Sequence, residues 1–217
     1  MKNLLHKEIK LASLPITYFF TAFGLMAFLP GYPIVTASFF VCMGIFQSFQ
    51  FARESNDAIY TLLLPIAKTE AVKSKFLFVV FIQLISFIIT AVCTMIRMIC
   101  LPNAEVYLQN PLLPANLFYL GFCLVCFGLF NLVFVRRYFK TAYKIGLPFL
   151  YYCLWAAVVI SLSETVKHIP GLSFFGTTDF SHIVLQATGL GAGVILFTVM
   201  TLLSYKSAVK SFERLDF

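Results

Sequence analysis

The chain has 217 residues, of which 60% are hydrophobic and 12% are charged, whereas an ordinary soluble domain has about 25% charged residues. Its formal net charge is +7. This composition excludes an ordinary water-soluble domain and predicts an integral membrane protein.

Long stretches without Asp, Glu, Lys or Arg define the predicted membrane spans. The longest, residues 11–52, is about twice the roughly 20 residues that cross a bilayer core, and Pro30-Gly31-Tyr32-Pro33 divides it at a turn. Continuous apolar runs favour helices over the alternating strands of a barrel. We therefore predict an all-α integral membrane protein in which residues 1–217 form a single domain with six transmembrane helices, at about 13–29, 34–52, 76–100, 114–135, 145–163 and 181–205.

Positive residues are distributed unevenly between the two predicted sides of the membrane. With the N-terminus inside, every Lys and Arg except Arg97 and Lys167 falls in a cytoplasmic segment. Cytoplasmic loops of membrane proteins carry an excess of Lys and Arg, so both termini are predicted to be cytoplasmic. The positive clusters flank the membrane, which favours anionic lipid headgroups over a nucleic acid as their partner.

A cleaved signal peptide is the alternative interpretation of the first span. The apolar run is longer than a usual signal core, and no convincing small-x-small cleavage site precedes Pro30, which favours a retained span.

Two further segments are predicted at the membrane surfaces. Residues 1–12 have the pattern of an amphipathic helix, with Leu4 and Ile9 on the apolar stripe and Lys7 on the polar one, and we expect an interfacial helix at the inner surface. The outer segment 164–182 is rich in Pro, Gly and Phe, which indicates either a short re-entrant hairpin or an aromatic anchor.

The cytoplasmic segment 52–75 is the most informative part of the sequence. Asn56 and Asp57 can start a helix, the residues that follow are mostly apolar through Leu64, and Pro65 stops it. Thr69 and Glu70 then predict a second helix start, with Thr69 at the cap, that leads into the third span. The first helix is too short to span a membrane and too apolar for water. It is either a docking helix or a helix lying on the membrane surface.

The sequence contains no recognisable enzyme, metal or cofactor signature. No GxxxxGK[ST] phosphate loop, HExxH or GxSxG occurs, and no carboxylate pair lies within a predicted span. The three histidines lack metal-ligand spacing, and the pair Cys123 and Cys126 fits small buried apolar residues better than a metal site. We therefore expect no enzymatic activity, metal or cofactor in this chain.

Amides and glycines within the predicted spans suggest contacts between helices. Gln83 and Asn131 are expected either to hydrogen-bond other helices or to contact a substrate. Gly189 and Gly193 have the GxxxG spacing that lets two helices approach closely.

The stretch LLPIAKTEAVKSKF at residues 63–76, with an acidic residue shortly after the second span, resembles the permease subunits of ABC-2 type transporters. The layout of the whole chain agrees with that family. In its small size and compact loops the chain is most similar to bacterial permeases that export amphipathic peptides, such as the phenol-soluble modulin exporters of Gram-positive bacteria.

This resemblance implies a multi-pass half-transporter of the bacterial cell membrane. Two permeases, expected to be a homodimer, surround a path for an amphipathic or hydrophobic peptide, and two copies of a separate ATP-binding cassette ATPase bind ATP and Mg²⁺. The helix in segment 52–75 becomes the coupling helix that docks on the ATPase, with the coupling residues Glu54, Asp57, Tyr60, Leu63, Leu64, Pro65, Lys68 and Glu70. Alternatives are a membrane-bound peptide-binding immunity or scaffold protein without transport, and an exporter of a lipid or drug.

Overall fold

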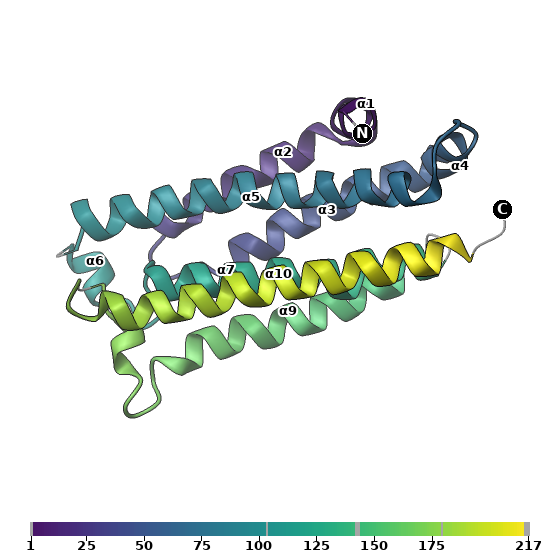
Figure 1. Ribbon diagram of the computed structural model, residues 1–217. Helices are drawn as coiled ribbons and strands as arrows, with labels where there is room; N and C mark the ends of the chain where they lie inside the picture. Colours follow the sequence, from purple (N-terminus) through teal and green to yellow (C-terminus); the bar gives the residue numbers. More distant parts are fainter. Residues whose placement is uncertain (1, 103, 142–143, 179, 215–217) are drawn as a thin grey trace.

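The computed structural model describes residues 2–102, 104–141, 144–178 and 180–214. Within these residues every regular element is a helix and no β-strand occurs (Figure 1). The predicted all-α class is confirmed.

Four helices are long and apolar enough to cross a membrane. They are α5 (Lys68–Cys100), the continuous helix Leu117–Lys140, α9 (Gly146–Val166) and α10 (Ile183–Glu213). The second of these comprises α7 (Leu117–Leu129), a π-helical stretch η3 (Phe130–Val135) and α8 (Arg136–Lys140). A helix satisfies its own backbone hydrogen bonds, as a lipid-embedded segment must, so these elements support a multi-pass membrane protein.

The N-terminal segment is sharply bent. α1 (Lys2–Lys7) continues into a π-helical turn, η1 (Glu8–Ala12), and is followed by α2 (Pro15–Thr21) and the 3₁₀ helix η2 (Ala22–Phe28). The two halves meet at 94°. Leu14 is extended, with φ −92° and ψ 147°, because the residue before a proline avoids the helical region. Counted as one unit, this bent segment raises the number of candidate spans to five.

The second predicted span, at about 34–52, corresponds to α3 (Thr36–Glu54), which has 19 residues. Gln47, Gln50 and Arg53 make α3 less apolar than the four helices that qualify as spans on length and hydropathy alone. The structure thus supports four to five spans, and the count of six stays a prediction.

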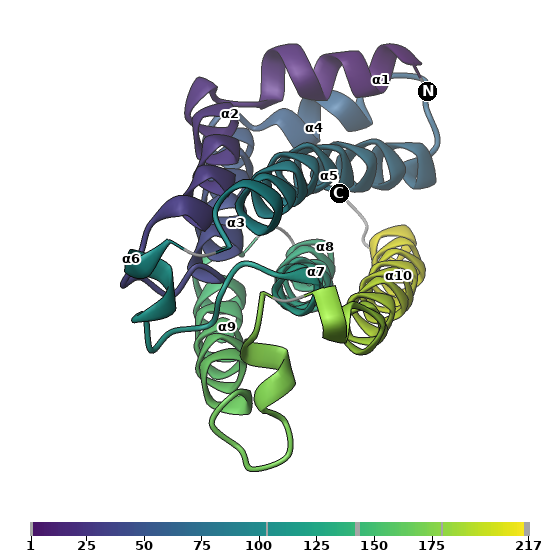
Figure 2. The same ribbon diagram turned by 90° about the vertical axis from the view of Figure 1, so that its left-hand side faces the viewer.

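The long helices run side by side, and the shorter elements gather at the two ends of the bundle (Figure 1). Both ends of the chain lie at the same end of the bundle as α4 (Asp57–Leu62). The opposite end carries α6 (Glu105–Leu108) and the 3₁₀ turns η4 (Ser173–Gly176) and η5 (Phe180–His182). Figure 2 shows α1 lying across the long helices rather than along them. An even number of crossings is required to place both termini at one end.

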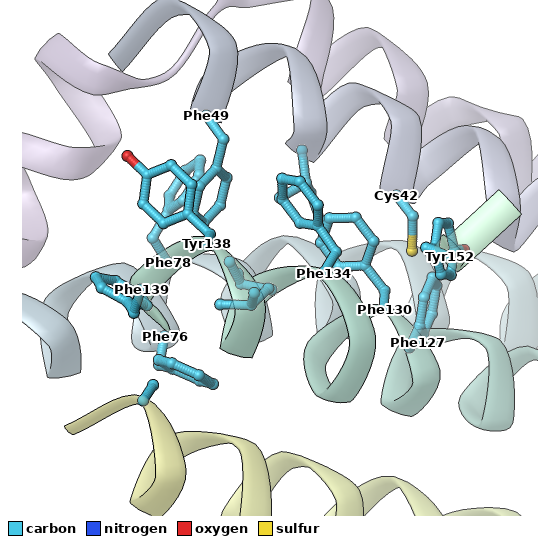
Figure 3. Packing of buried hydrophobic residues seen from close by; sticks show 14 of the residues in the cluster. Cys42, Phe49, Phe76, Phe78, Phe127, Phe130, Phe134, Tyr138, Phe139 and Tyr152 are labelled. Atoms are coloured by element: carbon cyan, nitrogen blue, oxygen red, sulfur yellow. The ribbon is translucent and has the colours of Figure 1, made fainter. Parts of the chain in front are cut away.

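Aromatic side chains fill the centre of the bundle (Figure 3). Phe46 stacks on Phe149 with ring centroids 3.9 Å apart, and Phe49 meets the edge of Tyr138 at 4.7 Å. Lipid tails are as apolar as these side chains, so association of helices in a membrane depends on close packing. Each aromatic pair adds about 0.5–1.5 kcal/mol beyond the burial of its area.

A buried polar network joins three helices beside the π-helical stretch η3. Gln83 and Asn131 exchange amide hydrogen bonds of 3.0 and 3.1 Å, and Asn131 also donates to Thr201 Oγ1 at 2.9 Å. The hydroxyl of Ser204 donates to the carbonyl of Asn131. Of the two roles considered for these amides, the structure shows contacts between helices.

Three glycines let α7 and α10 approach closely. A Cβ atom at Gly121 would lie 2.5 Å from the carbonyl oxygen of Gly189, and one at Gly193 would lie 2.6 Å from the backbone of Gly121. The GxxxG spacing of Gly189 and Gly193 therefore does what the sequence predicts.

Candidate functional site

The helix α4 is a short connecting helix between α3 and α5. It begins after Asn56, whose φ of 53° and ψ of 29° lie in the left-handed region that Asn adopts more readily than most residues. It ends at Leu62, and α5 starts at Lys68. The sequence predicted a helix through Leu64. The difference arises because the residue before Pro65 is kept out of the helical region and the last turn is lost.

One side of α4 is tied to the body of the protein by four charged side chains, which we call the ion-pair network: Lys7, Glu8, Asp57 and Lys75. The Asp57 carboxylate lies 2.6 Å from Lys7 Nζ and 3.1 Å from Lys75 Nζ. The Glu8 carboxylate lies 3.0 Å from Lys7 Nζ and 2.6 Å from Lys75 Nζ. Each cation therefore bridges both anions, and the network joins α1, η1, α4 and α5.

Hydrogen bonds from Thr61 extend this attachment. Lys7 Nζ donates to Thr61 Oγ1 at 2.7 Å, and the Thr61 hydroxyl donates to the backbone carbonyl of Asp57 at 2.7 Å. The hydroxyl of Thr61 is thus both acceptor and donor, as its chemistry allows.

The network is largely shielded from water. The Glu8 side chain is 2% exposed and those of Lys75 and Asp57 are 11% and 15% exposed. Burial by itself raises the pKa of the Asp57 carboxyl, but Lys75 and Lys7 more than offset burial, and the pKa is lowered from its ordinary value. The stabilisation from Asp57 is therefore fully present at neutral pH and is lost only as the pH falls through that lowered pKa.

α4 and the turn that follows it also expose apolar side chains. Ile59 is 54% exposed, Tyr60 66%, Leu63 77% and Leu64 47%. We call these four residues the apolar patch. The patch belongs to a segment that the ion-pair network holds in place. This segment lies at the end of the bundle where the termini lie (Figure 1).

The family profile described as ABC-2 family transporter protein matches residues 3–213, nearly the whole chain. The chain belongs to the ABC-2 transporter family. No curated protein and no solved structure matches it significantly. Membership makes the protein a permease subunit and implies an ABC ATPase as its partner.

The coupling residues predicted for this permease in and directly after α4 fall into two groups. Tyr60, Leu63 and Leu64 lie in the apolar patch. Asp57 instead points into the ion-pair network, so its position fits an anchor better than an outward contact.

The remaining predicted residues border α4. Glu54, at the end of α3, is exposed and accepts a hydrogen bond from Gln50 at 3.1 Å, and Pro65 is exposed in the turn. Lys68 and Glu70 are half-buried in the first turn of α5. The N-cap of α5 is Ala67, not the predicted Thr69, because the helix begins one residue before Thr69.

Sequence reasoning missed Glu8, Lys7 and Lys75 as members of the site. One signal was present: Glu8 is the only acidic residue before Glu54, and it lies among Lys2, Lys7 and Lys10. A single carboxylate in a basic amphipathic helix suggests a specific partner. Which partner it has depends on the fold, because Lys75 lies far along the chain.

Proposed function

We propose that this permease exports amphipathic or hydrophobic peptides from a bacterial cell, driven by a separate ATPase that binds ATP and Mg²⁺. The observation that carries the coupling part is the apolar patch: Tyr60 of α4 and Leu63 in the turn after it are exposed, while the ion-pair network fixes α4 to the rest of the protein. A contiguous exposed apolar surface marks an interaction site, and a rigid mount lets a pushed helix transmit force to α5 and α1.

The proposal of a permease pair rests on helix surfaces left uncovered in the single chain. Within its most apolar stretch α10 is only 11% buried and α9 is 28% buried, whereas Leu117–Lys140 is 67% buried. A second permease against part of this uncovered surface, with lipid on the rest, agrees with a two-subunit transporter.

The peptide substrate is inferred from the resemblance of the small permease to amphipathic-peptide exporters. Exposed aromatic and aliphatic side chains on the first span provide apolar surface suited to such a substrate. An apolar groove of about 290 Å³ there is lined by Phe19, Ala22, Phe23, Leu25, Met26 and Leu29.

Under the proposed six-span topology α4 is cytoplasmic and α6 is outside, and labelling of introduced cysteines tests this orientation. In a Cys100→Ser background, an impermeant maleimide should label Glu105→Cys in intact cells and Lys73→Cys only after lysis, since both positions are exposed. Labelling of position 73 from outside would refute this orientation.

Reconstitution tests the function as a whole. Permease co-expressed with an ABC ATPase and purified in detergent should form a complex of two permeases and two ATPases. In vesicles the complex should move an amphipathic helical peptide only with ATP and Mg²⁺. Binding of the peptide without ATP-dependent movement would favour a scaffold or immunity protein, and movement of a lipid or drug alone would overturn the peptide assignment.

A further inference from the structure

The most unusual charged side chain outside the α4 region is Arg97, at the opposite end of the bundle. It lies near the end of α5 and is 2% exposed, the largest fully buried side chain of the described residues. No carboxylate lies within ion-pair distance of it in the part of the chain that the structure describes. A buried cation without a counter-anion is costly, so this arrangement calls for an explanation.

Part of the guanidinium has a structural role. Nη1 donates to the backbone carbonyl of Ala27, and the Tyr107 hydroxyl donates to the next carbonyl, that of Phe28, at 2.9 Å. The ring of Tyr107 also lies over the guanidinium, with 3.9 Å between Cζ and the ring centroid. These contacts satisfy the last carbonyls of η2, where a positive charge is favourable.

In the part of the chain that the structure describes, the other edge of the same guanidinium has no partner. Nε and Nη2 are both buried and neither makes a hydrogen bond. Their N–H groups are parallel and lie on one edge of the planar guanidinium. Such an edge can donate two hydrogen bonds to two oxygens of one phosphate or carboxylate. Capping of η2 accounts for the hydrogen bond from Nη1, but Nε and Nη2 take no part in it.

A cavity of about 220 Å³ adjoins Arg97. Its lining includes Tyr107 and Leu108 of α6, Asn110, and Gly176 and Thr177 of the outer segment. Figure 2 looks onto the end of the bundle that carries α6. The walls combine hydrogen-bonding groups with apolar side chains, and they enclose one positive charge.

The surroundings of the cavity favour a lipid over a soluble ion. Leu108 and Val106 of α6 are 65% and 61% exposed, and Leu101 at the end of α5 is also exposed. Exposed apolar side chains such as these are suited to contact acyl chains, and lipid phosphates lie at the level of a span's last turn.

We propose that Arg97 and this cavity bind the phosphate of a phospholipid from the outer leaflet, with the Nε and Nη2 edge as the charged contact. Because both nitrogens are enclosed, the phosphate makes this contact when the Tyr107 ring and α6 shift aside. Lipid occupancy then supplies the missing counter-anion and ties α6 to the ends of α5 and η2. This inference does not rest on the transported substrate.

Native mass spectrometry and thermal unfolding of delipidated permease in detergent test the proposal. The probes are phosphatidylglycerol, a glycosyl diacylglycerol with the same acyl chains and no phosphate, and inorganic phosphate. The wild type should retain and be stabilised by phosphatidylglycerol, with roughly tenfold weaker affinity for the glycolipid, because a charge-assisted pair of hydrogen bonds is lost.

The variants Arg97→Gln and Arg97→Lys separate charge from fork geometry. Arg97→Gln should lose the preference for phosphate, and Arg97→Lys should keep part of it, because Lys retains the charge but not the fork. Arg137→Gln is the matched control, since Arg137 also lies over a tyrosine ring, that of Tyr151 at 4.4 Å, but belongs to α8. Because Arg137 belongs to a basic cluster that we expect to face anionic headgroups, this variant measures how much of the preference for phosphatidylglycerol comes from general positive charge, and its loss should be smaller than that of Arg97→Gln.

Every other outcome overturns the proposal. Equal affinity of the wild type for phosphatidylglycerol and the glycolipid would mean that water fills the cavity, and this comparison needs no variant. Stabilisation by inorganic phosphate but not by the lipid would identify a free-ion site. Retention of a co-purified peptide through Arg97 would identify a peptide carboxylate as the occupant.

Discussion

Replacing Tyr60 or Leu64 by Asp is expected to separate the permease from its ATPase. Both side chains belong to the apolar patch, 66% and 47% exposed in the single chain. Aromatic and aliphatic side chains at the centre of an interface carry most of its energy, and a charge placed there must be desolvated without a partner. We expect ATPase affinity to fall about 100-fold or more, measured by co-purification and by titration of the ATPase onto permease in nanodiscs.

Folding should survive these substitutions, because the patch lies outside the bundle core. Ile169→Asp is a matched control: Ile169 is 45% exposed, close to the value for Leu64, and lies in the turn after α9 at the other end of the bundle. It should leave ATPase affinity unchanged. Wild-type ATPase binding and transport in Leu64→Asp would show that α4 only lies on the membrane surface.

The four long apolar helices could be predicted from the charge-free stretches of the sequence. A continuous apolar stretch such as 76–96 is expected to cross a lipid bilayer as a helix, and the third span was predicted from it. The helix itself, α5, begins earlier, at Lys68. The earlier start has a physical cause, since five of the eight residues from Lys68 to Lys75 are Lys, Glu or Ala, which favour a helix, and they extend the same helix beyond the apolar stretch. The close approach of α10 to α7 at Gly189 and Gly193 could also be predicted, because the GxxxG pattern depends only on spacing along the chain.

The ion-pair network could not be predicted in this way. A carboxylate of η1 meets an ammonium of α5 only because Pro15 bends the N-terminal segment by 94° and lays α1 across the bundle. Asp57 was predicted as a coupling residue, whereas the structure pairs it with Lys7 and Lys75, since a sequence does not show on which side of a six-residue helix a flanking charge falls. Long-range contacts between charges depend on tertiary geometry, which local patterns do not encode.

The network makes a prediction distinct from that for the apolar patch. Asp57→Asn keeps the shape of the side chain and removes one of two anions, leaving Lys7 and Lys75 to share Glu8. Removing one partner of a buried ion pair costs about 3–5 kcal/mol, and we expect the lower end because the Asp57 side chain is 15% exposed. The thermal midpoint in detergent should fall accordingly. ATPase should still bind through the intact patch, within about twofold in affinity, while transport per ATP hydrolysed should fall, since α4 is no longer held to α1 and α5.

A neutral double variant separates charge imbalance from loss of coupling. Lys7→Gln with Asp57→Asn removes one cation and one anion and leaves the Glu8 to Lys75 pair, at 2.6 Å, in place. It should recover at least half of the lost stability, because buried charges are then balanced again. Transport per ATP should stay low, since the link from α4 to α1 is still missing. If the double variant is no more stable than Asp57→Asn, or if both transport at wild-type efficiency, the network is not the mount through which α4 acts on the spans.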